Sequence, residues 1–284
     1  MRLDPQAALT INFKRNIMTS IETTKIAFLG FGNMAQAFAD GLLKSGKIRG
    51  ENLAASAKNF EKLEKNTSSR GMHAFKSNKD AATWADVVVL AVKPYIIPSV
   101  VEEVKDLLDG KVVISVAANI LFDDYEEMLL PNTHHLTLMP NTPVAINEGV
   151  LLCEGKHSLA EDEKALVDTI LGLLGRVIYV DTSIMKAAGT ISGCGPAFVA
   201  MAIEALADAA VKHGVPRAMA YPLVSQTLAG TAKLQLATER HPAAMKDAVC
   251  SPAGTTIVGV ASLERSGFRG ALIEAVDAIL REKK

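Results

Sequence analysis

A short glycine-containing stretch near the N-terminus constrains the fold of this chain more than any other feature. An apolar run at residues 26–29 ends in the pattern Gly30-x-Gly32-x-x-Ala35 and passes directly into apolar positions that recur at helical spacing. The pattern predicts a strand, a tight turn and a helix. The first glycine suits the turn, the second lets the main chain approach a pyrophosphate, and the small third residue lets helix and strand pack closely. We therefore expect a dinucleotide site, with an ordinary tight turn as the alternative.

Apolar runs that follow this stretch predict a parallel sheet with helices on both faces. Continuous runs at residues 87–91 and 112–116 flank a predicted helix at 96–108, as expected of strands buried on both faces. Further strands are predicted at residues 53–56, 72–75, 135–138, 149–152 and 176–180, and further helices at 59–70 and 159–174. We expect residues 25–181 to form one α/β domain, a Rossmann-type doubly wound sheet.

The sequence changes character after residue 181. Strand patterns disappear, and helical stretches rich in alanine and other small residues follow one another. Helices are predicted at residues 184–189, 196–213, 217–238, 255–265 and 268–281. We expect residues 182–284 to form an all-helical dimerisation domain, because its helices are too apolar for the surface of a monomer and need a second subunit to complete their core.

The composition limits the classes of partner and compartment. Thirty basic and thirty-one acidic residues give a formal net charge of −1, so there is no electrostatic case for nucleic acid or for a membrane surface. No apolar run approaches the roughly 20 residues that span a bilayer, and we expect no transmembrane segment. Three widely spaced cysteines without a C-x-x-C pattern favour a reducing compartment, the cytoplasm. Residues 1–24 lack the apolar core of a secretory signal and are expected to be a disordered leader.

Loops after the predicted strands provide further cofactor-site residues, because ligands bind beyond the carboxyl ends of strands in open α/β sheets. Residues 91–94, 117–119 and 139–143 are such loops, with ordinary chain reversal as the alternative. At the end of the second strand stand Ser56 and Lys58, where an acid would bind the ribose 2′-hydroxyl of NAD. A hydroxyl and a cation suit the 2′-phosphate of NADP better. We expect NADPH as the cofactor, with NADH as a weaker substitute.

Two glycine-containing entries into helices lie in the helical region, at residues 192–198 and 251–256. Each presents backbone N–H groups that suit an anion, and simple helix capping is the alternative. The six histidines form no H-E-x-x-H pattern, and we expect no metal site.

The segment at residues 247–257, DAVCSPAGTTI, resembles the signature of the pyrroline-5-carboxylate reductases, which catalyse the last step of proline biosynthesis. Other blocks are similar to that family in its order and spacing: FLGFGNMA at 28–35, AVKP at 91–94, NTP at 141–143, SGCGPA at 192–197 and GFR at 267–269. The resemblance covers residues 25–282. Two departures are visible, Cys194 where the family often has serine and Ala253 where it often has glycine.

The resemblance implies an NADPH-dependent oxidoreductase that reduces the cyclic imine L-1-pyrroline-5-carboxylate to L-proline by hydride transfer. It also implies a homodimer interlocked through the helical domains, or a larger homo-oligomer. Together with the patterns above, the expected cofactor site comprises Gly30, Gly32, Asn33, Met34, Ala35, Ser56, Lys58, Asn78, Ala91, Val92, Lys93 and Pro94. The expected substrate site comprises Val249, Ser251, Gly254, Thr255 and Thr256.

Within that substrate site, Thr256 is the expected catalytic residue. Backbone N–H groups at residues 254–256 would receive the substrate carboxylate at a helix start. The ring nitrogen would then fall within reach of the Thr256 hydroxyl. A protonated imine is strongly electrophilic, so hydride transfer needs positioning more than it needs a strong acid, which explains a site short of His and Lys.

Two other functions are compatible with a dinucleotide fingerprint. A hydroxy acid dehydrogenase with a similar N-terminal domain would need a lysine in a G-x-x-G-x-x-x-K helix, but no lysine occurs between Lys186 and Lys212. A regulatory protein that binds NADP without turnover is supported only by the scarcity of acid–base residues. Consumption of NADPH with the imine would exclude it.

Overall fold

The computed structural model describes residues 21–281, and the chain divides into two compact units between residues 193 and 194. Most of the expected leader lies outside the described residues. Ile21 and Thr24, at its end, are buried, so residues 21–24 pack as part of the first unit. The unit boundary lies beyond residue 181 because one helix, α8 (Thr182–Lys212), begins in the first unit and continues into the second.

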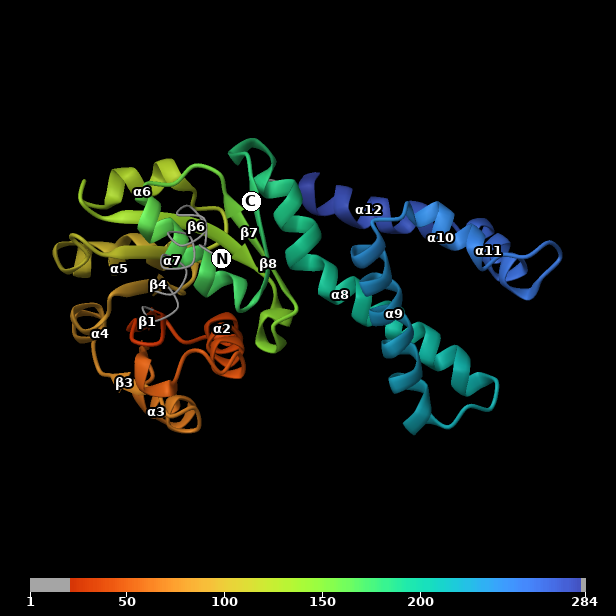
Figure 1. Cartoon of the computed structure of the whole chain (residues 1–284), viewed down its shortest axis with the longest axis horizontal. Helices are drawn as coiled ribbons and strands as arrows, with labels where there is room; N and C mark the ends of the chain where they lie inside the picture. Colours follow the sequence, from red (N-terminus) through yellow and green to blue (C-terminus); the bar gives the residue numbers. More distant parts are fainter. Residues whose placement is uncertain (1–20, 282–284) are drawn as a thin grey trace, which may run out of the picture. The chain divides into compact units, whose positions relative to one another are not determined.

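The first unit contains a single sheet of eight strands, in the order β3-β2-β1-β4-β5-β6-β7-β8 (Figure 1). The strands are β1 (Ile26–Leu29), β2 (Leu53–Ser56), β3 (His73–Phe75), β4 (Val87–Leu90), β5 (Val112–Ser115), β6 (His134–Pro140), β7 (Gly149–Glu154) and β8 (Gly175–Val180). All eight were predicted. The first six strands are parallel, whereas β7 runs antiparallel to β6 and β8 runs parallel to β7.

The expectation of an all-parallel sheet was therefore wrong at its last two strands. The cause is the short connection between β6 and β7, residues 141–148, which contains only the 3-10 turn η4 (Thr142–Ile146). A parallel crossover needs a dozen or more residues, so a connection of this length returns the chain antiparallel.

Helices cover both faces of this sheet. They are α2 (Asn33–Lys44), α3 (Phe60–Ser68), α4 (Asn78–Trp84), α5 (Ile97–Val104), α6 (Phe122–Met128) and α7 (Glu161–Gly172), with 3-10 turns η1 (Gly50–Asn52), η2 (Pro94–Ile96) and η3 (Lys105–Leu107). The sequence did not predict α4 and α6, because helices of 7 residues are too short to display a helical period. The helix expected at 96–108 is divided into η2, α5 and η3.

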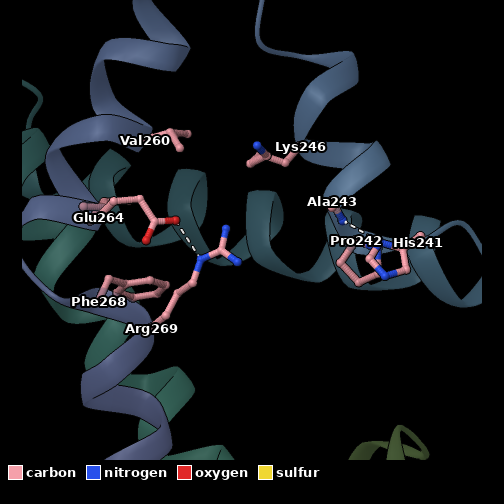
Figure 2. Close-up of a pocket in the computed structure, with 9 residues that line it drawn as sticks. His241, Pro242, Ala243, Lys246, Val260, Glu264, Phe268 and Arg269 are labelled. Atoms are coloured by element: carbon pink, nitrogen blue, oxygen red, sulfur yellow. Dashed lines mark hydrogen bonds and ion pairs between the residues drawn. The ribbon is translucent and has the colours of Figure 1, made fainter.

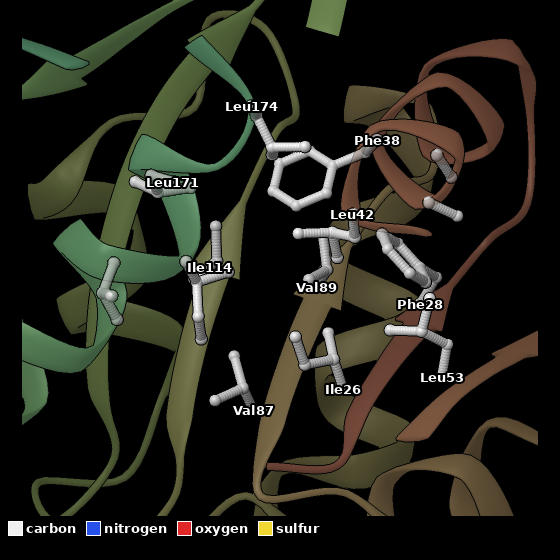
Figure 3. Packing of buried hydrophobic residues seen from close by; sticks show 14 of the residues in the cluster. Ile26, Phe28, Phe38, Leu42, Leu53, Val87, Val89, Ile114, Leu171 and Leu174 are labelled. Atoms are coloured by element: carbon white, nitrogen blue, oxygen red, sulfur yellow. The ribbon is translucent and has the colours of Figure 1, made fainter. Parts of the chain in front are cut away.

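Two hydrophobic clusters confirm that the sheet is buried on both faces. Ile26 and Phe28 belong to one cluster, whereas their neighbour Ala27 belongs to the other, because successive side chains of a strand point to opposite faces. Figure 3 shows the first cluster, in which Phe38 of α2 and Leu174, which follows α7, pack over the strands. This packing fixes the strand ends that the cofactor site requires.

The second unit consists of the rest of α8 and four helices. These are α9 (Arg217–Thr238), α10 (Pro242–Ala248), α11 (Thr255–Arg265) and α12 (Phe268–Arg281). The bounds of α9, α11 and α12 agree with the prediction, while α10 was not predicted. The buried apolar cluster of this unit is small and comprises Ala207, Ala220 and Val224. Most large exposed apolar side chains of the described residues lie on these helices.

The helix α8 differs from the prediction because it runs without interruption through Pro196. Proline lacks an N–H group and leaves the carbonyl four residues earlier, that of Ser192, without its helical partner. The side-chain amide of Asn141 donates to this oxygen at 3.1 Å. The helix therefore continues where the sequence alone predicted a break.

The continuous α8 also changes the expectation about membrane segments. Among the described residues, α8 is the one helix that is long and apolar enough to cross a bilayer, by length and composition alone. The sequence predicted two shorter helices here, at residues 184–189 and 196–213, and neither is long enough to span a bilayer. A helix that packs against another protein chain has the same length and composition, so this property by itself assigns no membrane role.

Candidate functional site

The glycine turn after β1 has the geometry that the fingerprint predicts. Gly30 has a φ of +95°, a conformation that favours glycine. A Cβ atom there would lie 2.6 Å from Val92 Cγ1 and 2.7 Å from the Ala91 carbonyl oxygen. The Gly30 N–H donates to the Ser56 carbonyl oxygen at 2.9 Å. The turn is thus held between the ends of β2 and β4, and only glycine fits it.

The helix that follows this turn begins without a side-chain cap. Its N-cap is Gly32, and no side chain accepts from the first turn. The N–H groups of the first residues, starting with Asn33 and Met34, have no partner within the helix. Ala35 is buried, whereas Gly32 and Asn33 are exposed. The N-terminus of α2 therefore presents backbone donors and the positive end of the helix dipole to an anion.

The ends of the central strands are aligned. Leu29 is level with Ser56 on one side and with Leu90 on the other, and Leu90 is level with Ser115. The glycine turn, Ser56 and the loop at residues 91–94 consequently lie at one edge of the sheet. Within this loop, Ala91 donates its N–H to the Leu29 carbonyl oxygen at 2.9 Å, while Lys93 is exposed.

Ser56 and Asn78, which were placed in the cofactor site from the sequence, are in direct contact. The buried Ser56 hydroxyl lies 2.8 Å from Asn78 Oδ1, and Asn78 Nδ2 donates to Glu103 Oε2 at 2.8 Å. Lys58 is exposed two residues after Ser56. Glu103 could not be predicted as a site residue, because one of two adjacent acids on an exposed helix face carries no signal of its contact with a residue 25 positions earlier.

The side chain of Asn141, in the loop after β6, forms hydrogen bonds to the backbone of β7 and of α8. The side chain of Asn141 accepts from the Val150 N–H at 2.8 Å and donates to the Ser192 carbonyl oxygen at 3.1 Å. A Cβ atom on Gly189 would lie 2.3 Å from Met139 Sδ, so α8 also packs closely on the end of β6. Two of the motifs, NTP and SGCGPA, are therefore joined by a hydrogen bond that supports α8.

The expected substrate residues lie along one segment of the second unit, around the start of α11. Gly254 is the N-cap, and its N–H donates to the Ser251 carbonyl oxygen at 3.0 Å. A Cβ atom on Gly254 would lie 2.4 Å from Ser251 Oγ, so a side chain there would require the Ser251 hydroxyl to move. Thr255, Thr256 and Val249 are all exposed in the single chain. The segment presents backbone donors and two threonine hydroxyls to solvent.

This segment contains one strained residue. Ala253 has a φ of +59°, in the left-handed region that non-glycine residues rarely adopt. Ala253 is also one of the two positions at which this sequence departs from the family pattern, which often has glycine there. The structure therefore gives a physical reason for that glycine, which the sequence comparison alone did not supply.

A cavity of about 410 Å³ lies close by in the same unit, between α10, α11 and α12 (Figure 2). Arg269 forms an ion pair with Glu264 at 2.7 Å, and Phe268 and Lys246 also line the cavity. None of the expected substrate residues lines it. The GFR motif at residues 267–269 thus contributes to this cavity and not to the turn at 251–256.

Burial shifts the pKa of several titratable groups in the core of the first unit. Burial raises the pKa of the Tyr125 hydroxyl to about 12 and that of the Cys153 thiol to about 12. Burial also lowers the pKa of His135. The expected substrate residues carry no titratable side chain that ionises near neutral pH. Among residues 21–281, no group of three or more His, Cys, Asp or Glu residues could hold a metal ion.

A sheet whose first six strands are parallel, with a glycine turn after the first strand, an uncapped helix start and aligned strand ends, indicates the class of dinucleotide-binding proteins with a Rossmann-type domain. Comparisons with known proteins narrow this class. Residues 25–119 match the family model described as NADP oxidoreductase coenzyme F420-dependent, and residues 182–284 match the model described as pyrroline-5-carboxylate reductase dimerisation.

Relatives that match nearly the whole chain are named pyrroline-5-carboxylate reductases, in agreement with the second family model. The chain is 42% identical over 259 residues to pyrroline-5-carboxylate reductase of Treponema pallidum, covering 90% of this chain and 98% of that protein. It is 38% identical over 258 residues to that of Methanosarcina acetivorans, with 90% and 95% covered. The structure of Plasmodium falciparum pyrroline carboxylate reductase with NADP bound superposes with a TM-score of 0.82 at 32% identity, covering 91% of this chain and 96% of that one. The chain belongs to the pyrroline-5-carboxylate reductase family.

Proposed function

We propose that this chain catalyses the NADPH-dependent reduction of L-1-pyrroline-5-carboxylate to L-proline, the last step of proline biosynthesis. The observation that carries the proposal is the presence, in one chain, of the nucleotide-binding turn at Gly30 and the family segment at the start of α11. The identity of about 40% to whole reductases supports the same reaction. The reaction consumes one NADPH and one proton for each imine reduced.

The residues at the edge of the sheet fit the cofactor. The cradle around Gly30 admits no side chain, and the backbone donors at Gly32, Asn33, Met34 and Ala35 suit the pyrophosphate. Ser56, Asn78 and Lys58 offer hydroxyl, amide and ammonium donors to the 2′-phosphate, and the loop of Ala91, Val92, Lys93 and Pro94 flanks the nucleotide. When bound, NADPH supplies the hydride. The solved Plasmodium relative holds NADP, which supports this cofactor over NADH.

The turn before α11 fits the substrate carboxylate. Thr255 and Thr256 provide backbone N–H groups at the start of a helix of 11 residues, where the helix dipole adds about 0.3–1 kcal/mol for an anion. Gly254 is the N-cap, and its own N–H already donates to the Ser251 carbonyl oxygen. Ser251 and Val249 flank them. The Thr256 hydroxyl would hydrogen-bond the ring nitrogen as the imine carbon accepts the hydride, orienting the ring and relaying a proton through water.

We also propose that the protein is a cytoplasmic homodimer or a larger homo-oligomer assembled through the second unit. Large apolar side chains there are strongly exposed in the single chain, among them Met201 at 68%, Val258 at 64% and Ile273 at 63%. A hollow of about 1030 Å³ is lined mainly by apolar side chains of α9 and α10. The dimerisation family to which residues 182–284 are similar supports a second copy as the partner.

The activity is tested by mixing the purified protein with NADPH and pyrroline-5-carboxylate and following NADPH absorbance and proline formation. We expect the two to change in equal amounts, with a higher kcat/KM for NADPH than for NADH. Absence of proline would refute the proposed reaction. An equal or higher kcat/KM with NADH would refute the cofactor assignment at Ser56 and Lys58.

A further inference from the structure

The amide of Asn78 is held at both ends by side chains from two other elements. Its Oδ1 lies 2.8 Å from the hydroxyl of Ser56, at the end of β2. Its Nδ2 lies 2.8 Å from a carboxylate oxygen of Glu103, near the end of α5. Asn78 itself is the first residue of α4, after the N-cap Ser77. Three elements thus meet at this one side chain.

The carboxylate determines which way the amide faces. A carboxylate oxygen only accepts hydrogen bonds, so the amide atom beside Glu103 must be the nitrogen. The amide oxygen then faces Ser56, whose hydroxyl is the donor. The reversed amide would place two acceptors 2.8 Å apart and lose the bond to Glu103. Glu103 therefore selects one of two amide orientations that are otherwise nearly equivalent in shape.

This orientation matters for a phosphate ligand. An amide nitrogen carries two hydrogens, and Glu103 takes one, so the second stays available as a donor. The Ser56 hydroxyl can rotate from Asn78 to a ligand oxygen. The 2′-phosphate of NADPH presents acceptor oxygens and needs such donors, whereas the 2′-hydroxyl of NADH can also donate.

We propose that Glu103 is a positioning residue of the cofactor site, which fixes the Asn78 amide as a donor for the 2′-phosphate of NADPH and so contributes to the preference for NADPH over NADH. The proposal rests on the cofactor site proposed above. The negative charge of Glu103 repels the phosphate, so Glu103 can favour NADPH only through the hydrogen bond that it accepts from Asn78. Removing the acceptor and removing the charge should consequently have different effects.

Two substitutions separate these effects. Glu103→Ala removes both acceptor and charge, and we expect KM and Kd for NADPH to rise about threefold to tenfold, the range for one hydrogen bond, while kcat stays within about twofold. KM for NADH should change less than about twofold. Glu103→Gln keeps an acceptor oxygen without the charge, and should bind NADPH as tightly as the wild type or more tightly. The readouts are nucleotide titration by fluorescence and steady-state kinetics.

A matched control is available on the same helix. Glu102 is the preceding acid, is exposed, and pairs with Lys105 at 2.8 Å. Glu102→Ala removes the same charge one residue away and should leave KM for NADPH within about twofold of the wild type. Thermal unfolding of each variant checks the fold, and Glu103→Leu, which keeps more of the side-chain bulk, replaces Glu103→Ala if the latter unfolds early.

The proposal is overturned if Glu103→Ala binds NADPH like the wild type, or if Glu103→Gln is weakened as much as Glu103→Ala. An equal loss for NADPH and NADH would also overturn it, because the contact would then be structural. A wild-type protein that binds neither nucleotide would instead refute the cofactor site itself. The two failures are therefore distinguishable.

Discussion

Thr256 is the single side chain on which the proposed chemistry depends most. The structure excludes the alternative that it caps its helix, because the N-cap of α11 is Gly254 and no side chain caps the helix. Thr256→Val keeps the shape and removes the hydroxyl. Losing a hydrogen bond worth about 1–3 kcal/mol in the transition state should lower kcat roughly tenfold to a hundredfold.

The measurement is kcat at saturating NADPH and imine, with nucleotide affinity and thermal unfolding as controls. Both controls should match the wild type, because the hydroxyl is exposed in the single chain and Thr256 is not among the residues proposed to bind the nucleotide. Wild-type kcat in the valine variant, or loss of activity that follows loss of folding, would contradict the catalytic role.

Ala253 provides a second prediction at the scale of one residue, because its φ of +59° is costly for any residue with a Cβ. Ala253→Gly removes strain of about 1–2 kcal/mol, offset by about 0.4–1 kcal/mol of extra chain entropy in the unfolded state. We expect unchanged or slightly higher stability. Ala253→Val should lower the free energy of unfolding in urea, since a β-branched residue fits this region worst. A valine variant as stable as the wild type would show that the turn relaxes to another conformation.

At the scale of elements, Asn141 is the residue that lets α8 pass through Pro196. It is buried, and Asn141→Ala would leave the Val150 N–H and the Ser192 carbonyl oxygen without partners. We expect a loss of about 1–3 kcal/mol in the free energy of unfolding. Asn66→Ala, a partly exposed asparagine on α3, should change it by less than about 0.5 kcal/mol.

A double-mutant cycle isolates the bond to α8. Pro196→Ala restores a backbone N–H that can bond the Ser192 carbonyl oxygen. In that background, Asn141→Ala should cost about 1 kcal/mol less than it does in the wild type. Additive effects in urea unfolding would show that Asn141 supports β7 alone.

The same elements show how far the sequence determines the fold. The central strands were predicted because continuous apolar runs such as residues 87–90 mark strands buried on both faces. The direction of β7 and the continuity of α8 depend on connection length and on Asn141, which lies 51 residues from its partner. Local patterns cannot report such a contact. The candidate site shows the same difference between local and distant contacts. Gly30 was predicted from its local motif, whereas the contact of Glu103 with Asn78 is visible only in the folded structure.

At the scale of the whole molecule, the first unit can fold around two large apolar clusters, but the second unit has too little core of its own. Its exposed apolar side chains would stabilise the fold only if another surface covers them. Assembly and stability should therefore be linked. The thermal midpoint should rise with protein concentration, and light scattering should give at least twice the chain mass of 30.2 kDa.

A charged residue within this apolar surface should break the assembly. Ile273 of α12 is 63% exposed, and Ile273→Glu would place a carboxylate in the buried interface, at a cost of several kcal/mol for an unpaired charge. We expect the mass measured by light scattering to fall toward that of a single chain. Activity should be lost as well, because the second unit would no longer be supported by a partner. The matched control is Ile146→Glu, in η4 of the first unit, where the isoleucine is 54% exposed. That variant should keep the mass of the wild type. A fully active Ile273→Glu monomer would refute assembly through the helical unit as a requirement for function.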